Sequence, residues 1–396
     1  MARFANGKAP FIRKTDNSSY GTTSIMRDFL IALVPVILFA WYKNGIKVYM
    51  DGNVGIWEML YPLLFIMMGG LLAYVMEALF MVVTDAKNRD VKIVMKNLEL
   101  SYALIPGLLI AMVLPLYTPI WVLMFGVFMG SIVGKMLFGG FGNNIFNPAI
   151  LGYLMVGFTL TGVINQAGGL FNASEVLVDA YAGATPLGML SSAQTLSYDT
   201  LVAPYGNLWD FFTGMIPGAL AETSALVILI SYLWLVARKI ISWFTPIIYI
   251  GTVFVISWLI GVIVGDGGLW FPTYSILSGG LFFGAVFMAT EPVTSPRNPL
   301  GKVFFALFLG VLTTLFRFIG VYPEGVATSI IVMNLFTMPM DNVTSVIRAH
   351  GLKKPALMRC AALSLGFVLL VIYVLFKANQ TYTLLIEPIT SLGGVF

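Results

Sequence analysis

The chain has 396 residues, of which 59% are hydrophobic and only 10% are charged, and its formal net charge is +4. Soluble domains carry about 25% charged residues, so this chain cannot cover a surface that faces water. The composition therefore predicts an integral membrane protein. The single cysteine and single histidine exclude a disulfide framework and a histidine-rich metal site. The positive charge is no argument for nucleic acid binding, because the basic residues follow membrane topology.

Eleven apolar segments approach the length of about 20 residues that a helix needs to cross a membrane. They are predicted to be helices, since an isolated strand leaves its backbone groups unpaired in lipid. The predicted spans are 28–43, 56–84, 99–116, 118–138, 148–164, 210–237, 241–264, 270–290, 302–319, 325–341 and 356–376. The expected fold class is therefore an all-α polytopic membrane protein.

Lysine and arginine predict the orientation, because they concentrate in cytoplasmic loops. With the N-terminus inside a bacterial cell, 18 of the 22 basic residues fall in cytoplasmic segments. The four that fall outside are Lys43, Lys47, Arg317 and Lys377. This orientation predicts a multi-pass inner-membrane protein whose loop 165–209, which has no basic residue, faces the periplasm or the exterior.

Two segments of the chain resemble each other, residues 126–150 and 310–327. Each has a glycine-containing helix with a cation near its end (Lys135 or Arg317), then a Gly/Pro hairpin and an apolar helix. An odd number of helices, five, separates the copies, which inverts one copy relative to the other in the membrane. The pattern predicts about ten helices as two inverted five-helix repeats, plus one extra C-terminal helix. The alternative is that membrane hairpins converge on glycine and proline without duplication.

The predicted organisation follows from these spans and repeats. It comprises an N-terminal cytoplasmic segment (1–27), a first repeat (28–164), an external loop (165–209), a second repeat (210–345) and a C-terminal extension (346–396).

The segment 179–187 reads Asp-Ala-Tyr-Ala-Gly-Ala-Thr-Pro-Leu. Thr185 and Pro186 are typical of a helix N-cap and a first helical residue. The same threonine can also carry a phosphoester, whose phosphate would lie among free N–H groups at the positive end of the helix dipole. The two interpretations are compatible.

The turn 138–149 reads Phe-Gly-Gly-Phe-Gly-Asn-Asn-Ile-Phe-Asn-Pro-Ala. It lacks the Gly-Lys-Ser/Thr ending of a nucleotide-binding loop. One interpretation is a sharp helix hairpin in which Asn147 caps the next span. The amides of Asn144 and Asn147 also offer donors and acceptors that suit the edge of a flavin ring.

Three carboxylates are candidates for an ion pathway, since an ionisable group in lipid is costly. Glu77 lies in the second predicted span, Glu222 in the sixth, and Asp341 closes the tenth. The alternative is that these groups pair with a neighbouring subunit or stay protonated inside the bundle.

Four motifs together resemble the family of the D subunits of Rnf-type ferredoxin:NAD oxidoreductases and, at one remove, the B subunits of sodium-translocating NADH:quinone oxidoreductases. They are residues 138–149, Gly-Ala-Thr-Pro-Leu at 183–187, Met-Ala-Thr-Glu-Pro-Val at 288–293 and Tyr-Pro-Glu-Gly at 322–325. The resemblance covers about residues 9–345. The short N-terminal segment and the Thr-Pro-Leu ending favour the Rnf member.

The resemblance implies a flavin mononucleotide (FMN) bound covalently to Thr185, within an attachment motif that includes Asp179, Gly183 and Pro186. A flavin transferase would install it outside the membrane. The resemblance also implies a noncovalent riboflavin near Asn144 and Asn147. The family motif usually has serine or threonine at the position of Ala182.

The implied function is a membrane subunit that couples electron transfer between ferredoxin and NAD to Na⁺ or H⁺ translocation. The implied partners are other Rnf subunits, including a flavin-bearing G-type subunit and iron–sulfur B- and C-type subunits. The chain has no nucleophile–base pair and no nicotinamide-binding fold, so the NAD site is expected on a partner.

Three alternatives stay open at this point. The chain could be the B-type component of a Na⁺-translocating NADH:quinone oxidoreductase, a solute channel or transporter with inverted repeats and no redox role, or a scaffold for other redox subunits.

Overall fold

The computed structural model describes residues 21–84, 90–166, 185–192, 196–264, 267–318, 325–350 and 354–392. Within these ranges every regular element is a helix. The first half contains α1 (Thr22–Trp41), a π-helical turn (Tyr42–Ile46), α2 (Lys47–Met50), α3 (Ile56–Thr84), α4 (Val91–Ser101), α5 (Leu104–Val113), α6 (Ile120–Val127) with its π-helical continuation η3 (Phe128–Met136), α7 (Pro148–Thr159) and α8 (Thr161–Gln166).

The second half begins with short helices and continues with long ones. It contains α10 (Pro186–Ser192), α11 (Tyr198–Leu201), a 3₁₀ turn (Ala203–Tyr205), α12 (Leu208–Thr213), α13 (Ala225–Ala237), α14 (Phe244–Val264), α15 (Trp270–Leu277), α16 (Leu281–Phe283) with its π-helical continuation η5 (Gly284–Met288), α17 (Pro299–Phe318), α18 (Gly325–His350) and α19 (Lys354–Leu392).

Within the described ranges, five helices are long and apolar enough to cross a membrane, or seven if each of two bent pairs is counted as one span. This confirms an all-helical polytopic membrane protein. The first of the five runs over Thr22–Met50, so it starts earlier and ends later than the predicted span 28–43.

Three predicted spans, 99–116, 210–237 and 270–290, are wrong as continuous helices. In the first, Tyr102 takes a left-handed conformation (φ 52°) that ends α4, and α5 continues at a bend of 52°. In the second, Gly214 (φ 90°) ends α12, and helix resumes only after Ser224 caps α13. In the third, Gly279 (φ 65°) lies in a 63° bend between α15 and α16. Hydropathy records these segments as apolar but carries no signal for the bends.

The non-helical segment 214–224 is held inside the bundle by other elements. The amides of Leu220 and Ala221 donate to the carbonyls of Leu114 and Met112, at 3.2 and 2.9 Å. These are among the carbonyls that the end of α5 leaves without an intrahelical partner. Lys43 Nζ donates to the Ile216 carbonyl at 2.6 Å. Irregular backbone is tolerated at membrane depth only when it is satisfied in this way by protein.

Small residues bring the helices of the first half close together. A Cβ atom on Gly107 of α5 would clash with the carbonyl oxygen of Gly69 on α3, and one on Gly152 of α7 would clash with that of Gly126 on α6. Contacts between glycines let helix backbones approach, which stabilises helix pairs in lipid. These contacts set the distances between α3 and α5 and between α6 and α7.

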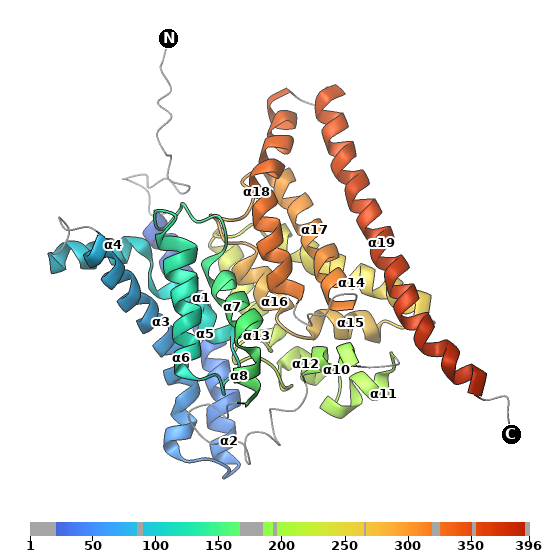
Figure 1. Ribbon diagram of the computed structural model, residues 1–396, viewed down its shortest axis with the longest axis horizontal. Helices are drawn as coiled ribbons and strands as arrows, with labels where there is room; N and C mark the ends of the chain where they lie inside the picture. The colour runs from blue at the N-terminus through green and yellow to red at the C-terminus, as the bar shows by residue number, and fades with distance from the viewer. Residues whose placement is uncertain are drawn as a thin grey trace.

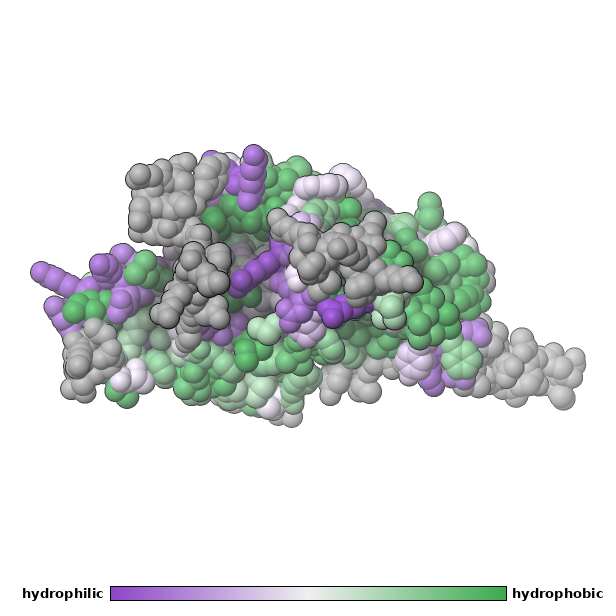
Figure 2. Space-filling model, turned by 90° about the horizontal axis from the view of Figure 1, so that it is seen from above, coloured by the Kyte–Doolittle hydropathy of each residue, from purple (hydrophilic) through white to green (hydrophobic). Residues whose placement is uncertain are grey.

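Figure 1 shows the helices as a bundle in which α1 begins, α4 lies and α18 meets α19 at one end, while α2, α8 and α10–α12 lie at the opposite end. Seen from the first end, the molecule carries hydrophilic residues over its surface and apolar residues along its flanks (Figure 2). α19 packs along one edge of the bundle against α14, α17 and α18.

Candidate functional site

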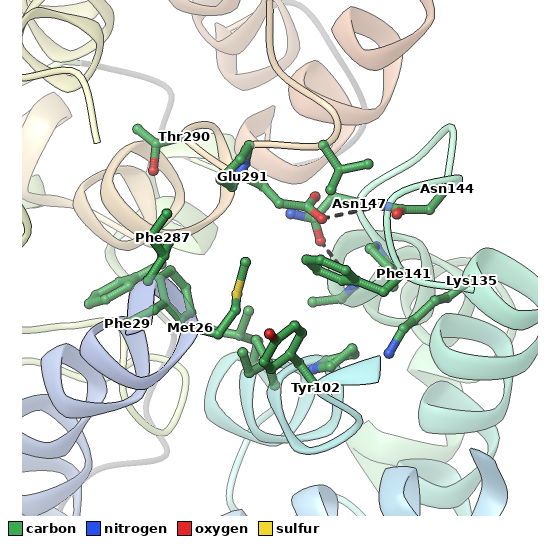
Figure 3. A pocket seen from close by; sticks show the side chains of 18 of the residues that line it. Met26, Phe29, Tyr102, Lys135, Phe141, Asn144, Asn147, Phe287, Thr290 and Glu291 are labelled. Carbon is green, nitrogen blue, oxygen red and sulfur yellow. Dashed lines mark hydrogen bonds between the residues drawn. The ribbon is translucent and has the colours of Figure 1, made fainter. Parts of the chain in front are cut away.

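A pocket opens where α1 begins, where α4 bends into α5, and where the turn 138–147 meets the segment after η5. We call it the aromatic pocket (Figure 3). It is lined by Ile25, Met26, Phe29, Tyr102, Ile105, Pro106, Leu109, Lys135, Phe141, Asn144, Asn147, Pro148, Ala149, Ile240, Ile241, Phe287, Thr290, Glu291, Pro292 and Val293. Most of its wall is apolar, and its few polar groups come from elements far apart in the sequence.

Two aromatic pairs form much of that wall. Phe29 and Phe287 meet edge to face with ring centroids 5.7 Å apart, and Tyr102 and Phe141 do so at 5.0 Å. The left-handed turn at Tyr102 is therefore part of the pocket, because it sets that ring against Phe141. A planar ring system is the kind of ligand that such a wall accommodates.

Asn147 has the capping role predicted from the sequence. Its Oδ1 accepts from the amides of Ala149 and Ile150 at 2.9 and 3.2 Å, and Pro148 is the first residue of α7. Its Nδ2 donates to the Met288 carbonyl at 3.3 Å. Asn147 therefore joins the turn 138–147 to the segment after η5, and its own hydrogen-bonding groups are largely occupied.

Asn144 keeps more capacity for a ligand. Its Nδ2 donates to the Phe146 carbonyl at 3.1 Å and to Glu291 Oε1 at 3.3 Å, whereas its Oδ1 has no hydrogen-bond partner in the described part of the chain. Figure 3 shows Asn144 and Glu291 facing each other across the pocket.

Glu291 is a site residue that the sequence analysis missed. Thr294 Oγ1 donates to its Oε2 at 2.8 Å. Removal from water raises the pKa of the Glu291 carboxyl to about 7, although hydrogen bonds from Thr294 and Asn144 and the charge of Lys135 oppose that shift. A carboxyl with such a pKa can hold or release a proton near neutrality. The Met-Ala-Thr-Glu-Pro-Val motif contained it, but only the fold shows that it faces Asn144.

Lys135 lies in the wall of the pocket and forms a buried ion pair with Glu77. Its Nζ is 2.7 Å from Glu77 Oε1 and also donates to the carbonyl of Ser101 at 2.7 Å. The Ser101 hydroxyl donates to the other carboxylate oxygen of Glu77. Lys135 thus satisfies a carbonyl at the end of α4, where the helix has no continuing backbone donor. Glu77, an ion-pathway candidate from sequence, has two partners.

Glu222 lies at the other end of the described site residues, on the non-helical segment 214–224. It is 7% exposed, and in the ranges that the structure describes its carboxylate accepts no hydrogen bond. It lies against Gly280 in the α15–α16 bend and shares a small cavity with Leu187 and Arg317. Arg317 donates to the carbonyls of Ser275 and Ser278, at 2.6 and 3.1 Å.

Thr185 begins α10 close to that cavity. Its side chain is exposed, and its Oγ1 accepts from the amide of Gly188 at 3.1 Å, so the predicted N-cap is confirmed. The carbonyl of Pro186 accepts from the Tyr274 hydroxyl at 2.5 Å, which ties α10 to α15. Two further predicted residues, Asp179 and Gly183, lie outside the described residues.

Asp341 is remote from both groups. Its carboxylate accepts from the amides of Arg297 and Asn298 at 2.9 to 3.0 Å, just before α17. It therefore acts as an acidic cap at the positive end of that helix.

Comparison with known proteins adds to this geometry. The model of the NQR2, RnfD, RnfE family matches residues 6–348. The D subunit of the proton-translocating ferredoxin:NAD(+) oxidoreductase complex of Clostridium ljungdahlii is 32% identical over 87% of this chain and 96% of its own length. The Na(+)-translocating counterpart of Acetobacterium woodii is 30% identical, over 87% and 95%. The B subunit of the Na(+)-translocating NADH-quinone reductase of Chromohalobacter salexigens is 32% identical, over 60% and 57%.

The Lys135–Glu77 pair yields a stability prediction. Lys135→Met is expected to destabilise the protein by about 3–5 kcal/mol, because it leaves the buried Glu77 carboxylate without its cation. The double variant Lys135→Met/Glu77→Gln should recover most of that loss, since no buried charge remains. Thermal unfolding in detergent measures both.

The exposed Lys96 on α4 supplies the matched control, and Lys96→Met should change stability little. A double variant as unstable as Lys135→Met would contradict the pairing.

Proposed function

The chain belongs to the NQR2, RnfD, RnfE family, and we propose that it is the D-type membrane component of an Rnf-type complex that couples electron transfer between ferredoxin and NAD to Na⁺ or H⁺ translocation. Relatives named as the D subunits of such complexes align over 87% of this chain and at least 95% of their own length. The quinone reductase relative aligns over 57% of its length. This difference in coverage favours the Rnf assignment over the quinone reductase one.

The observation that carries the redox role is the aromatic pocket. A flavin supplies one- and two-electron chemistry when bound, and the residues present fit one. Tyr102 and Phe141 offer ring contacts, Asn144 Oδ1 offers an acceptor for a ring N–H, and Glu291 can exchange a proton at the ring edge. We propose that this pocket holds the noncovalent flavin, expected to be riboflavin, and that Asn147 positions the turn that carries Asn144.

Thr185 is proposed as the attachment point of a covalent FMN through a phosphoester. Its exposed hydroxyl at the start of α10 supports this, because a reagent can reach it and the phosphate would meet the positive end of a helix. Asp179, Gly183 and Pro186 are retained as parts of the attachment motif. A flavin transferase would form the ester bond.

The proposed orientation has the N-terminus in the cytoplasm and Thr185 outside. It draws support from the opposite ends at which α1 begins and α10 lies (Figure 1), together with the distribution of basic residues. The G-type subunit and the iron–sulfur B- and C-type subunits are proposed partners, with the NAD site on one of them.

We also retain the two inverted repeats as part of the proposal. Lys135 lies in η3 and donates to a carbonyl at the α4–α5 bend, and Arg317 near the end of α17 donates to carbonyls at the α15–α16 bend. The two cations predicted to correspond therefore make the same kind of contact in their own halves, which convergence on Gly and Pro hairpins does not require.

Among the three carboxylates, we propose Glu222 as the one that takes part in ion transfer. Glu77 is paired with Lys135, and Asp341 accepts three backbone hydrogen bonds. Glu222 has no such partner in the described chain, and it lies beside broken helices of the kind that form ion sites in transporters.

Thr185→Asn separates the two roles of Thr185. Asparagine keeps the helix cap but cannot form the ester, so the variant should fold normally while its denatured band loses all flavin fluorescence under ultraviolet light. Wild-type protein from its native host is the reference. If its denatured band has no flavin either, the covalent FMN is excluded.

Asn144→Ala tests the aromatic pocket. We expect flavin released by acid from the purified chain to fall by about tenfold, the effect of losing one or two ligand hydrogen bonds. Asn143→Ala is the matched control, because Asn143 is an exposed neighbour in the same turn and does not line the pocket. Equal flavin loss in both variants would point to damage to the turn and remove the pocket assignment.

Glu222→Gln tests the ion role in the assembled complex reconstituted into vesicles. The ion concentration for half-maximal turnover is expected to rise severalfold, because the neutral amide cannot stabilise a cation or carry a proton, while flavin content stays normal. Glu77→Gln is expected to lower stability without that shift. A shift in Glu77→Gln alone would transfer the role to Glu77.

A further inference from the structure

We propose that a cavity between the first turns of α14 and α17 binds a phosphate group, and we call it the phosphate cavity. It lies beside the aromatic pocket, at the end of the bundle where α1 begins. Its polar lining comprises Ser242, Thr245, Thr290, Ser295, Arg297 and Lys302. The proposal goes beyond the redox function and does not depend on it.

The donors of this cavity are arranged across the two helices. Lys302 Nζ donates to Ser242 Oγ at 2.6 Å, so the Ser242 hydroxyl keeps its own proton for another acceptor. Thr245 is only 2% exposed, and its hydroxyl has no hydrogen-bond partner in the described residues. A buried hydroxyl without a partner costs stability unless a ligand or water satisfies it.

The charges around the cavity favour an anion. Arg297 and Lys302 line it, and each helix N-terminus adds about half a positive charge. No acidic residue is among the described lining residues. Asp341 is occupied by the amides before α17, and the Glu291 carboxylate accepts from Asn144 and Thr294 in the aromatic pocket. Carboxylates already engaged in other hydrogen bonds do not supply the acceptor that the cavity donors need.

A phosphate ester matches these donors better than a carboxylate or chloride. Its oxygens can accept from a guanidinium, an ammonium and two hydroxyls at once, and such charge-assisted bonds are the stronger class. Helix N-termini add main-chain N–H groups suited to the same ligand.

Two molecules could bring that phosphate. One is a membrane phospholipid, because the neighbouring Trp243 is 60% exposed, as expected for a side chain at the headgroup level. The other is a flavin mononucleotide whose ring occupies the aromatic pocket, because Ile240, Ile241, Thr290 and Pro292 line both cavities. Both sources share the phosphate ester.

The experiment measures binding to the purified full chain in detergent. One arm compares dioctanoyl phosphatidylglycerol with dioctanoylglycerol, which lacks the phosphate, by native mass spectrometry. A second arm compares FMN with riboflavin by quenching of flavin fluorescence. The variants are Arg297→Gln/Lys302→Gln, Thr245→Val, and Lys239→Gln as a control that removes an exposed cation outside the cavity.

In at least one arm, the phosphate-bearing ligand should bind more tightly than its phosphate-free counterpart. That preference should fall by about tenfold or more in the double variant, since each lost charge-assisted bond is worth about that factor. It should fall by a smaller factor in Thr245→Val and stay unchanged in Lys239→Gln. A preference for phosphatidylglycerol assigns the cavity to lipid, and a preference for FMN assigns it to the flavin.

The proposal is overturned if neither arm shows a preference for phosphate. It is also overturned if Lys239→Gln weakens the preference as much as the double variant, because the effect would then be that of surface charge alone.

Discussion

The hydrogen bonds of Lys135 hold together the part of the molecule on which the aromatic pocket depends. A single ammonium group, on a side chain that is 2% exposed, bonds the Glu77 carboxylate on α3 and the last carbonyl of α4. The α4–α5 bend leaves that carbonyl without a helical donor, and the bend is what sets Tyr102 against Phe141. A buried cation is costly unless its geometry is good and its donors are used. Here both conditions are met, so the bend and the pocket wall are stabilised together.

The opposite end of the bundle is built on a related contact. Arg317 donates to two carbonyls at the α15–α16 bend, and Gly279 and Gly280 in that bend admit Leu187 and Glu222. The helix that begins at Thr185 is tied to the same region by the bond from Tyr274 to Pro186. In each half, a long basic side chain therefore satisfies the backbone of a broken helix, which frees the chain to make a site where it bends.

These contacts give the proposed function a spatial order. The aromatic pocket and the phosphate cavity lie at the end of the bundle where α1 begins, and Thr185 and Glu222 belong to the region around α10 and the α15–α16 bend. A redox component of a translocating complex needs electron-carrying groups and an ion-binding group that are separated but mechanically linked. η5 and α17 run between the two regions, so a change at one bend has a rigid route to the other.

The sequence alone determined the membrane class, the all-helical fold, and the caps at Asn147 and Thr185, because these depend on composition and on neighbours within three residues. The 288–293 motif also contained Glu291, but nothing local tells that its carboxylate meets Asn144, 147 residues away. Likewise, Glu77 and Lys135 are 58 residues apart, and neither has an adjacent opposite charge. The tertiary structure decided these pairs and the bends in the segments 99–116, 210–237 and 270–290. A broken helix in a membrane persists only where distant side chains and backbone satisfy its free polar groups, and only packing brings those partners together.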